Sequence, residues 1–201
     1  MWHSKKLGLN EGANYSQFPS KKWHLMLKFE FPNFAGFPQT ELFMTFFTAD
    51  YCDEHHEKIQ VLGPGFQNYG GIARCEGQIV TVLLNKHNGD LIKLLRDVNG
   101  TGKVVVVDVA AEYYAVVGEK LMNFAQQNNY SGIIINGYVR DTAQINDIKV
   151  ALYAIGTCPR KYMVPMDGAL NVPVSFAGVH FVPGDYLYAD GDGIILTKQP
   201  I

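Results

Sequence analysis

Continuous apolar runs mark the centre of this chain. Residues 102–110 read GKVVVVDVA and residues 131–139 read SGIIINGYV, with β-branched side chains at successive positions. A strand covered on both faces has this pattern, because side chains that point to either side are then buried. A third run, KVALYAIG at 149–156, has the same character. We therefore predict three buried strands, of which 103–109 and 132–139 are consecutive.

A helix is predicted between the first two of these strands. EYYAVV at 112–117 is rich in β-formers and is a poor helix interior, whereas EKLMNFAQQNN after Gly118 has its apolar residues on one face. We therefore begin the helix at Gly118. One helix between consecutive strands has a length suited to a parallel crossover. The centre of the chain is thus predicted to be β-α-β.

Two further helices are predicted before this centre. NGDLIKLLRDV has apolar residues at helical spacing, and its helix is expected to end near Gly100. TADYCDEHHEKI is read as a short helix with Thr48 as a candidate N-cap, since a threonine hydroxyl accepts a backbone N–H of the first turn.

The flanking segments are predicted to be mostly β. YGGIARCEGQIVTVLL is read as two short strands around a Glu76-Gly77 turn. The tail from Asn171 is hairpin-like, with turn signals at Ala177-Gly178, Pro183-Gly184 and Asp190–Gly193. The predicted class is mixed α/β, with a parallel β-α-β centre and β-hairpin flanks.

Residues 1–43 differ from the rest of the chain. They contain scattered aromatic residues and no sustained period of 2 or 3.6, and are read as an irregular extension before a domain at 44–201. Met26 and Met44 leave open a native start further downstream.

Composition narrows the function classes. The chain of 201 residues is 47% hydrophobic and 18% charged, which is typical of a globular protein. Its net charge of −2 gives no basic footprint for direct nucleic acid binding. Three widely separated cysteines form no zinc spacing and fit a reducing compartment. No apolar run is long enough for a membrane span, so a cytoplasmic location is expected.

Candidate chemistry lies at the end of the second buried strand, where Arg140 and Asp141 follow Val139. Ligands of parallel sheets collect beyond the carboxyl ends of strands, and the free N–H groups of a helix beginning at Gly118 favour anions. With Glu119, this set suits a small carboxylate substrate on a hard cation such as Mg²⁺ or Mn²⁺. The alternative is an ordinary surface ion pair with little energetic effect.

A family resemblance favours the first interpretation. The motifs TADYCDEHHEKIQVL, NYGGIARCEGQIVTV, GKVVVVD, INGYVRD, ALYAIGTCPRK and VPVSFAGVHFVPGDYLYADGDGIIL follow one another in this order. Together they resemble the family of the regulator of ribonuclease activity A (RraA) and the class II 4-hydroxy-4-methyl-2-oxoglutarate aldolases, over residues 44–201. The resemblance implies a swivelling β/β/α domain resembling the phosphohistidine domain. It also implies a homotrimer with active sites at subunit interfaces.

The resemblance also implies roles for particular residues. Enzymes of the family have an acidic residue, twenty intervening positions and then Arg-Asp, and here Glu119 precedes Arg140 and Asp141 at that spacing. Asp141 is then expected to hold the metal and Arg140 to contact the substrate. Glu119 is a candidate base acting through water. The substrate carboxylate is expected at the helix start, formed by Gly118, Glu119, Lys120 and Leu121.

The implied activity is metal-dependent cleavage of 4-hydroxy-4-methyl-2-oxoglutarate to pyruvate, with oxaloacetate decarboxylation through the same pyruvate enolate. The rival function is a non-catalytic regulator that binds ribonuclease E and restrains RNA turnover. Such regulators lack part of the acid and Arg-Asp set, which is complete in this sequence. We therefore favour the enzyme. An older label for this family, a methyltransferase of menaquinone synthesis, is not supported, because the sequence has no Gly-rich loop with an acidic residue suited to binding a nucleoside cofactor.

The sequence departs from the family pattern at three places. Glu119 stands where Asp is usual, Val109–Glu112 replaces a Gly-rich segment that follows Asp108, and Gln144 replaces a frequent acid. The missing glycines are expected to crowd the site floor or to alter the approach of the backbone. Asp108 itself either lines the cleft or caps a backbone group. Arg160 and Lys161 in TCPRK are assigned a structural or interface role, with substrate contact as the alternative.

Overall fold

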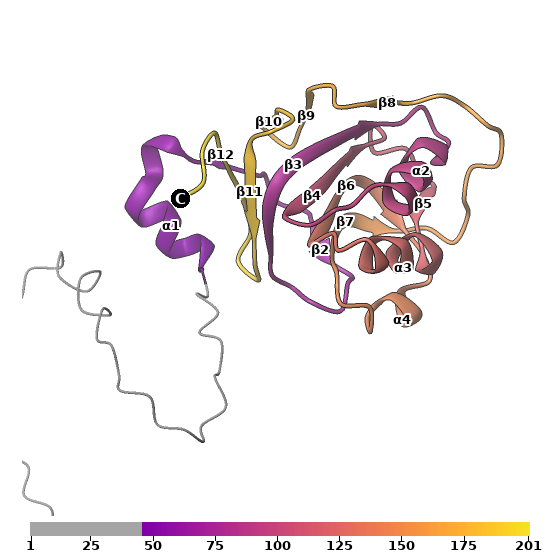
Figure 1. Cartoon of the computed structure of the whole chain (residues 1–201), viewed down its shortest axis with the longest axis horizontal. Helices are drawn as coiled ribbons and strands as arrows, with labels where there is room; N and C mark the ends of the chain where they lie inside the picture. Colours follow the sequence, from indigo (N-terminus) through magenta and orange to yellow (C-terminus); the bar gives the residue numbers. More distant parts are fainter. Residues whose placement is uncertain (1–45) are drawn as a thin grey trace, which may run out of the picture. The chain divides into compact units, whose positions relative to one another are not determined.

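The computed structural model describes residues 46–201. The irregular extension predicted for residues 1–43, and the predicted start of the domain at residue 44, lie outside the described residues and stay predictions. The described part contains a ten-stranded sheet and a separate two-stranded sheet (Figure 1).

Four parallel strands form the middle of the main sheet. They lie in the order β3-β4-β6-β7, with bounds Cys75–Leu83, Lys103–Asp108, Gly132–Val139 and Ala151–Thr157. Each neighbouring pair among them is parallel. The three predicted buried strands are confirmed as β4, β6 and β7, and α3 (Glu119–Gln127) connects β4 to β6 as the predicted crossover helix.

Shorter strands extend this sheet. Most of them pair antiparallel, and β5 adds a parallel pairing to the carboxyl end of β6. They are β1 (Gln60–Val61), β2 (Gln67–Asn68), β5 (Ala115–Val117), β8 (Ala169–Leu170), β11 (Tyr186–Ala189) and β12 (Ile194–Thr197). A separate hairpin consists of β9 (Val174–Phe176) and β10 (Val179–Phe181). The mixed α/β class is therefore confirmed.

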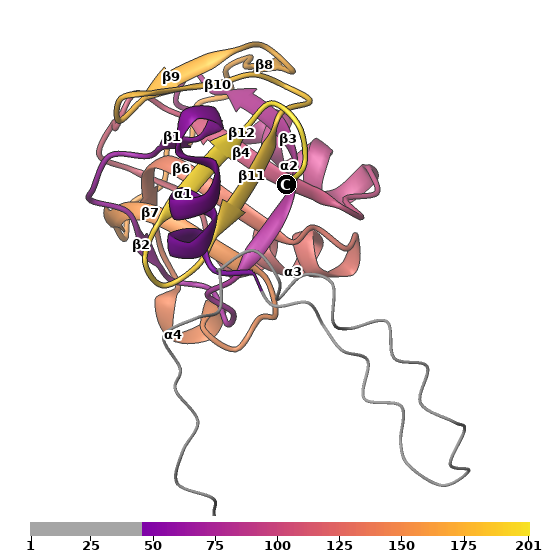
Figure 2. The ribbon, with the colours of Figure 1, turned by 90° about the vertical axis from the view of Figure 1, so that its left-hand side faces the viewer.

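The parallel strands are covered on both faces, which explains their uninterrupted apolar sequences. Along β4, Val105 and Val107 pack in the cluster that contains α2 (Gly89–Asp97) and α3, whereas Val104 and Val106 pack in a second cluster with β9–β12. Successive side chains of a strand point to opposite faces, so both alternate sets are buried. Figures 1 and 2 show α2 and α3 on one side of these strands and the β9–β12 segments towards the other.

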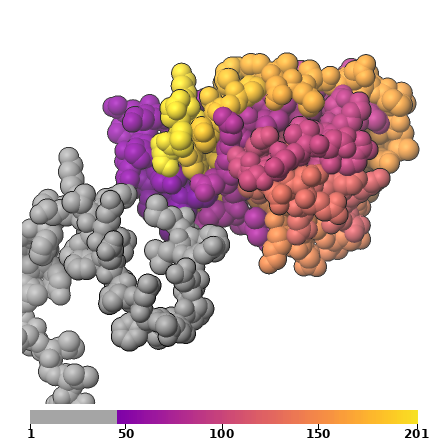
Figure 3. Space-filling view, viewed as in Figure 1, coloured from indigo at the N-terminus to yellow at the C-terminus, as the bar shows by residue number. Residues whose placement is uncertain are grey.

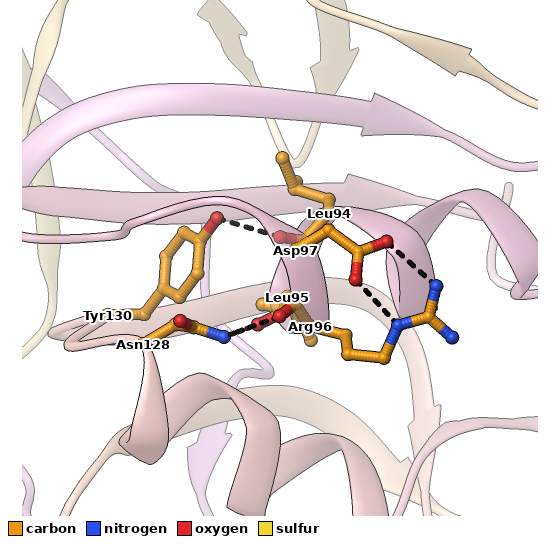
Figure 4. A network of polar contacts seen from close by, with 6 residues as sticks. All are labelled: Leu94, Leu95, Arg96, Asp97, Asn128 and Tyr130. Carbon is orange, nitrogen blue, oxygen red and sulfur yellow. Dashed lines mark hydrogen bonds and ion pairs between the residues drawn. The ribbon is translucent and has the colours of Figure 1, made fainter.

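A polar network fixes the C-terminal end of α2 against the segment that follows α3 (Figure 4). The side-chain amide of Asn128 donates to the carbonyl oxygens of Leu95 and Arg96, both at 2.8 Å, and the Tyr130 hydroxyl donates to Leu94 O at 3.1 Å. The Leu95 and Arg96 carbonyls belong to the last turn of the helix, where backbone acceptors lack N–H partners further along, and Leu94 O also accepts the N–H of Val98 at 3.2 Å. The network thus satisfies the end of α2 and ties it to the segment after α3. Burial raises the pKa of Tyr130 to about 12, so the hydroxyl stays a donor at neutral pH.

The prediction of two strands around Glu76-Gly77 is wrong. Residues 75–83 form the single strand β3, which pairs with β11 through both Glu76 and Gly77. The glycine is needed for packing, because a Cβ at position 77 would stand 2.7 Å from the carbonyl oxygen of Gly102. A glycine within a strand often marks such close approach of another backbone segment rather than a turn.

The N-cap prediction for Thr48 is also wrong. Thr48 is the first residue of α1 (Thr48–His55), and Phe47 occupies the cap position without a side-chain hydrogen bond. Asp190, at the end of β11, supplies the missing acceptors: Thr48 N–H donates to its Oδ2 at 2.8 Å and the Thr48 hydroxyl donates to its Oδ1 at 2.7 Å. A carboxylate distant in the sequence therefore caps this helix.

The predicted hairpins of the tail are confirmed. β9 and β10 are joined at Ala177-Gly178, whose φ values of 47° and 81° suit a tight hairpin turn. β11 and β12 are joined by the turn Asp190–Gly193, in which Asp190 N–H donates to Gly193 O at 3.0 Å. Across residues 46–201, no helix combines the length and apolar character that a membrane crossing requires.

Two short helices complete the described elements, η3 (His56–Lys58) and α4 (Thr142–Ile145). The segment between β7 and β9 runs along the outside of the domain past α2 and β3, and it is visible as an orange band in Figure 3. Part of this segment contributes to the cavity described next.

Candidate active site

A cavity of about 230 Å³ lies at the carboxyl ends of the parallel strands. Its walls come from the segment after β3, from β5 and the start of α3, from the end of β6, and from the segment after β7. Polar and charged side chains lining it are His87, Asn88, Lys120, Arg140, Asp141, Lys161 and Tyr162. The carboxyl edge of the parallel strands is thus where the sequence predicted a ligand site.

The start of α3 meets the end of β6 in this cavity. Glu119 N–H donates to Oδ2 of Asp141 at 3.2 Å, so a first-turn amide of the helix faces the carboxylate. Gly118 occupies the N-cap position with an extended backbone. A Cβ at position 118 would overlap Oδ2 of Asp141 and would stand 3.1 Å from Cγ of Arg140. The glycine therefore permits the close approach of the Arg-Asp pair to the helix.

Asp141 has an unusual backbone conformation. Its φ of 58° and ψ of 36° lie in the left-handed region, which few residues other than glycine adopt. It is the residue before α4, yet its side chain is directed to the N-terminus of α3 rather than to its own helix. The Nε of Arg140 lies 3.6 Å from the same Oδ2, and both side chains are about one-third exposed, at 35% and 37%. A partly exposed carboxylate held in this way remains accessible to a ligand.

Five of the six predicted site residues line the cavity: Gly118, Lys120, Leu121, Arg140 and Asp141. Glu119 is an exposed residue whose backbone N–H reaches Asp141 but whose side chain is not part of the cavity wall. The geometry thus brings together the predicted guanidinium, carboxylate and helix N-terminus. The catalytic and binding roles assigned to these residues stay predictions.

Asp108 was predicted either to line the cleft or to cap a backbone group, and the structure shows the second. Its Oδ1 accepts the N–H of Ala110 and the side-chain amide of Asn136, both at 2.8 Å. Ala110 and Ala111 follow with φ values of 53° and 55°, a conformation that glycine adopts without steric cost. Alanines therefore occupy a left-handed backbone at the positions where the family pattern has glycines. These alanines do not line the cavity, so the expected crowding of its floor is not found there.

His87 and Asn88 line the cavity but were not among the predicted site residues, and Lys161 lines it although a structural or interface role was predicted for it. His87 Nδ1 accepts the N–H of Gly89 at 3.1 Å, and Asn88 Nδ2 donates to Val116 O at 2.6 Å. Both residues follow β3 and precede α2. Ligands bind beyond the carboxyl ends of parallel strands, and the same rule applied to β3 would have identified His87 and Asn88. Lys161 is at the cavity because the segment after β7 pairs with Ala115 of β5.

The donor set restricts the kind of metal that fits. Residues 46–201 contain no group of three His, Cys, Asp or Glu side chains able to hold an ion together. Asp141 is the one carboxylate that lines the cavity within this range. Zinc sites require several protein ligands, whereas Mg²⁺ keeps several waters and is bound through one or two carboxylates. The residues present therefore fit a hydrated hard cation shared with a substrate.

Comparison with known proteins defines the class. Residues 48–196 match the RraA-like family Aldolase/RraA, and the chain belongs to this family. A protein of Azotobacter vinelandii is 40% identical over 159 residues, which cover 79% of this chain and 98% of that protein. Its name is "Putative 4-hydroxy-4-methyl-2-oxoglutarate aldolase".

Two solved structures share the fold. One, from Geobacillus kaustophilus, is described as an S-adenosylmethionine:2-dimethylmenaquinone methyltransferase; it is 36% identical with a TM-score of 0.75, covering 78% of this chain and 97% of that one. The other is the RNA-processing inhibitor RraA of Thermus thermophilus, 31% identical with a TM-score of 0.74, covering 79% and 96%. The predicted family is thus confirmed, and its members carry three different functional names.

Proposed function

We propose that this protein is a divalent-metal-dependent lyase that cleaves 4-hydroxy-4-methyl-2-oxoglutarate to pyruvate and also decarboxylates oxaloacetate. The observation that carries the proposal is the convergence of Asp141, Arg140 and the N-terminus of α3 in one cavity. The aldolase name of relatives about 40% identical supports a lyase. Mg²⁺ or Mn²⁺ is the proposed cofactor, since a single carboxylate with water suits these ions.

The proposed cleavage breaks the bond between C3 and C4 of the substrate. The 4-hydroxyl loses its proton, C4 becomes the keto carbon of one pyruvate, and the bonding electrons move through C3 into the 2-keto group. The resulting enolate is protonated at C3 to give the second pyruvate. Oxaloacetate loses CO₂ instead and reaches the same enolate, so one site would serve both reactions. In both cases negative charge develops on the 2-keto oxygen.

The residues of the cavity suit this charge distribution. The guanidinium of Arg140 places positive charge and donors where the enolate oxygen would form, and such preorganised donors are commonly the largest contribution to catalysis. The first-turn amides of α3 favour the adjacent carboxylate of the substrate. Asp141 would hold the cation, which when bound supplies Lewis-acid stabilisation of the keto acid. Glu119 is the proposed base. Because its exposed side chain does not line the cavity, it would act through a water molecule.

The test is pyruvate release from oxaloacetate, coupled to lactate dehydrogenase, with and without Mg²⁺. We expect Asp141→Asn to abolish the Mg²⁺-dependent rate, because an amide binds the cation weakly. Asparagine tolerates left-handed φ, so the backbone at 141 is retained. Asp147→Asn is the matched control, since Asp147 is exposed and does not line the cavity. Equal rates for the wild type and Asp141→Asn would remove the basis of the proposal.

A second candidate function is regulation of RNA turnover. The observation that favours it is the match to the Thermus RNA-processing inhibitor RraA along nearly the whole of that chain. A regulator that binds ribonuclease E would do so without the cavity chemistry, so Asp141→Asn would keep its inhibitory effect. RNA cleavage assays with purified ribonuclease E, in the presence of the wild type or of Asp141→Asn, distinguish the regulator from the enzyme. The homotrimer is likewise proposed, and sedimentation equilibrium measures it directly.

A further inference from the structure

The charges that line the cavity are unbalanced. Lys120, Arg140 and Lys161 are cationic, and Asp141 carries the opposing charge. Arg140 is engaged by Asp141, and Lys120 Nζ lies over the ring of Phe124, 5.8 Å from its centroid. Among the ion pairs of residues 46–201, none involves Lys161. The ammonium of Lys161 is thus available to an anionic group of a ligand.

Lys161 and Arg140 approach the cavity from opposite edges of β5. Ala115 of β5 pairs with Tyr138 of β6 on one edge and with Lys161 on the other. Ala115 N–H donates to Arg160 O at 2.7 Å, which fixes the backbone beside Lys161. Because neighbouring strands are about 4.8 Å apart, the backbone at Lys161 lies on the order of 10 Å from the end of β6. The two cationic side chains therefore reach inward from well-separated supports.

We propose that Lys161 binds the distal carboxylate of a 2-keto dicarboxylate whose keto acid end lies at Arg140 and Asp141. The inference rests on the proposed function, because it assigns the second end of the same substrate. In a five-carbon chain with C–C bonds of about 1.5 Å, the carboxylate carbons are about 5 Å apart. That length fits between side chains supported on the order of 10 Å apart. A lysine on its flexible stem then forms a charge-assisted hydrogen bond with the distal carboxylate.

This assignment makes a distinction between the two reactions. In the aldol cleavage the distal carboxylate keeps its charge and becomes the carboxylate of one product, so Lys161 binds substrate and transition state equally. In oxaloacetate decarboxylation the distal carboxylate leaves as neutral CO₂, so Lys161 stabilises the ground state more. Lys161→Met is therefore expected to raise KM for both substrates, with kcat unchanged for the aldol cleavage and raised for oxaloacetate. A merely structural role for Lys161 would not produce this division.

Binding of two keto acids tests the inference directly. 2-Oxoglutarate has the five-carbon dicarboxylate backbone but lacks the 4-hydroxyl that cleavage requires, and pyruvate has a single carboxylate. In calorimetric titrations with Mg²⁺, the wild type is expected to bind 2-oxoglutarate about tenfold more tightly than pyruvate. Lys161→Met is expected to lose this preference and to bind pyruvate as the wild type does. Lys149→Met, at an exposed lysine that does not line the cavity, is the matched control and keeps the preference.

The outcomes separate the inference from the proposed function. If Lys161→Met weakens both ligands equally, or neither, the subsite is overturned even when oxaloacetate turnover supports the lyase. If the wild type releases no pyruvate but shows a preference that depends on Lys161, the lyase proposal fails and the dicarboxylate subsite stands. Failure of the folded wild type to bind 2-oxoglutarate overturns the subsite. Thermal melting of each variant establishes that it is folded.

Discussion

Gly118 allows Arg140 and Asp141 to lie close to the N-terminus of α3, and the candidate site depends on this contact. Gly118→Ala perturbs the contact with a single methyl group. An ideal Cβ at this position would stand about 1 Å inside the ordinary contact distance from Oδ2 of Asp141, and 3.3 Å from Nε of Arg140. The overlapping atom is the end of a side chain rather than backbone, so Asp141 can rotate away. The variant should therefore fold with its Asp141 carboxylate displaced by about 1 Å.

The stability cost of Gly118→Ala is expected to be small. The φ of −145° at Gly118 is extended and suits alanine, so no backbone strain is added. Alanine is a poorer N-cap than glycine, and the hydrogen bond from Glu119 N–H to Asp141 is lost. Together these effects amount to about 1 kcal/mol, or a fall in Tm of about 2–4 °C for a chain of this size.

The effect on activity is expected to be much larger. Displacement of a catalytic group by about 1 Å can reduce a rate about 10²-fold, and the Asp141 carboxylate is the proposed cation ligand. The measurement is kcat/KM for oxaloacetate beside the thermal melting curve of the same preparation. Gly191→Ala is the control, because nothing lies within 4 Å of a Cβ at that position. A Gly118→Ala protein that melts near the wild type and retains its full rate would refute the reasoning.

Two further predictions concern stability. Ala111→Gly should stabilise the protein by about 0.5–1 kcal/mol in a denaturant titration, because relief of left-handed strain at φ 55° exceeds the added entropy of the unfolded chain. Ala143→Gly, within α4, should destabilise the protein in the same titration. The pKa of Asp90 is lowered by hydrogen bonds from the Gly168 N–H and the Lys93 ammonium. Its stabilising effect is therefore complete above the unfolded pKa of about 3.9 and is lost as pH falls through the lower folded value. The stability difference between the wild type and Asp90→Asn should be constant above about pH 5 and shrink below about pH 4, and a pH-independent difference would contradict this.

The three functional names among the relatives are compatible with one fold, because activity depends on the groups in the cavity rather than on the sheet. The cavity side chains of this chain include Arg140 and Asp141, which follow β6, and the backbone of Asp141 is left-handed. A conformation that costs free energy and exposes a carboxylate is more often kept for a ligand than for stability. For this reason the lyase is the first function to test.

The sequence determined the elements whose pattern is local. Both faces of β4 are buried, so its four valines are apolar without interruption, and the run alone identified a covered strand. β-Formers before Gly118 and helix-formers after it located the start of α3. The order of these elements then placed Arg140 and Asp141 beside the N-terminus of α3, since the carboxyl ends of parallel strands share one edge.

Tertiary structure decided the features that depend on distant residues. Gly77 lies within β3 because the backbone of Gly102 passes close to it, and α1 is capped by Asp190 rather than by its own threonine. Lys161 lines the cavity because its backbone pairs with Ala115 of β5. In each case the partner is 25 to 142 positions away along the chain, so no local pattern records the contact. Propensity and periodicity describe neighbours in sequence. Close packing of backbone segments, and helix caps supplied by residues distant in the sequence, arise only when the chain is folded.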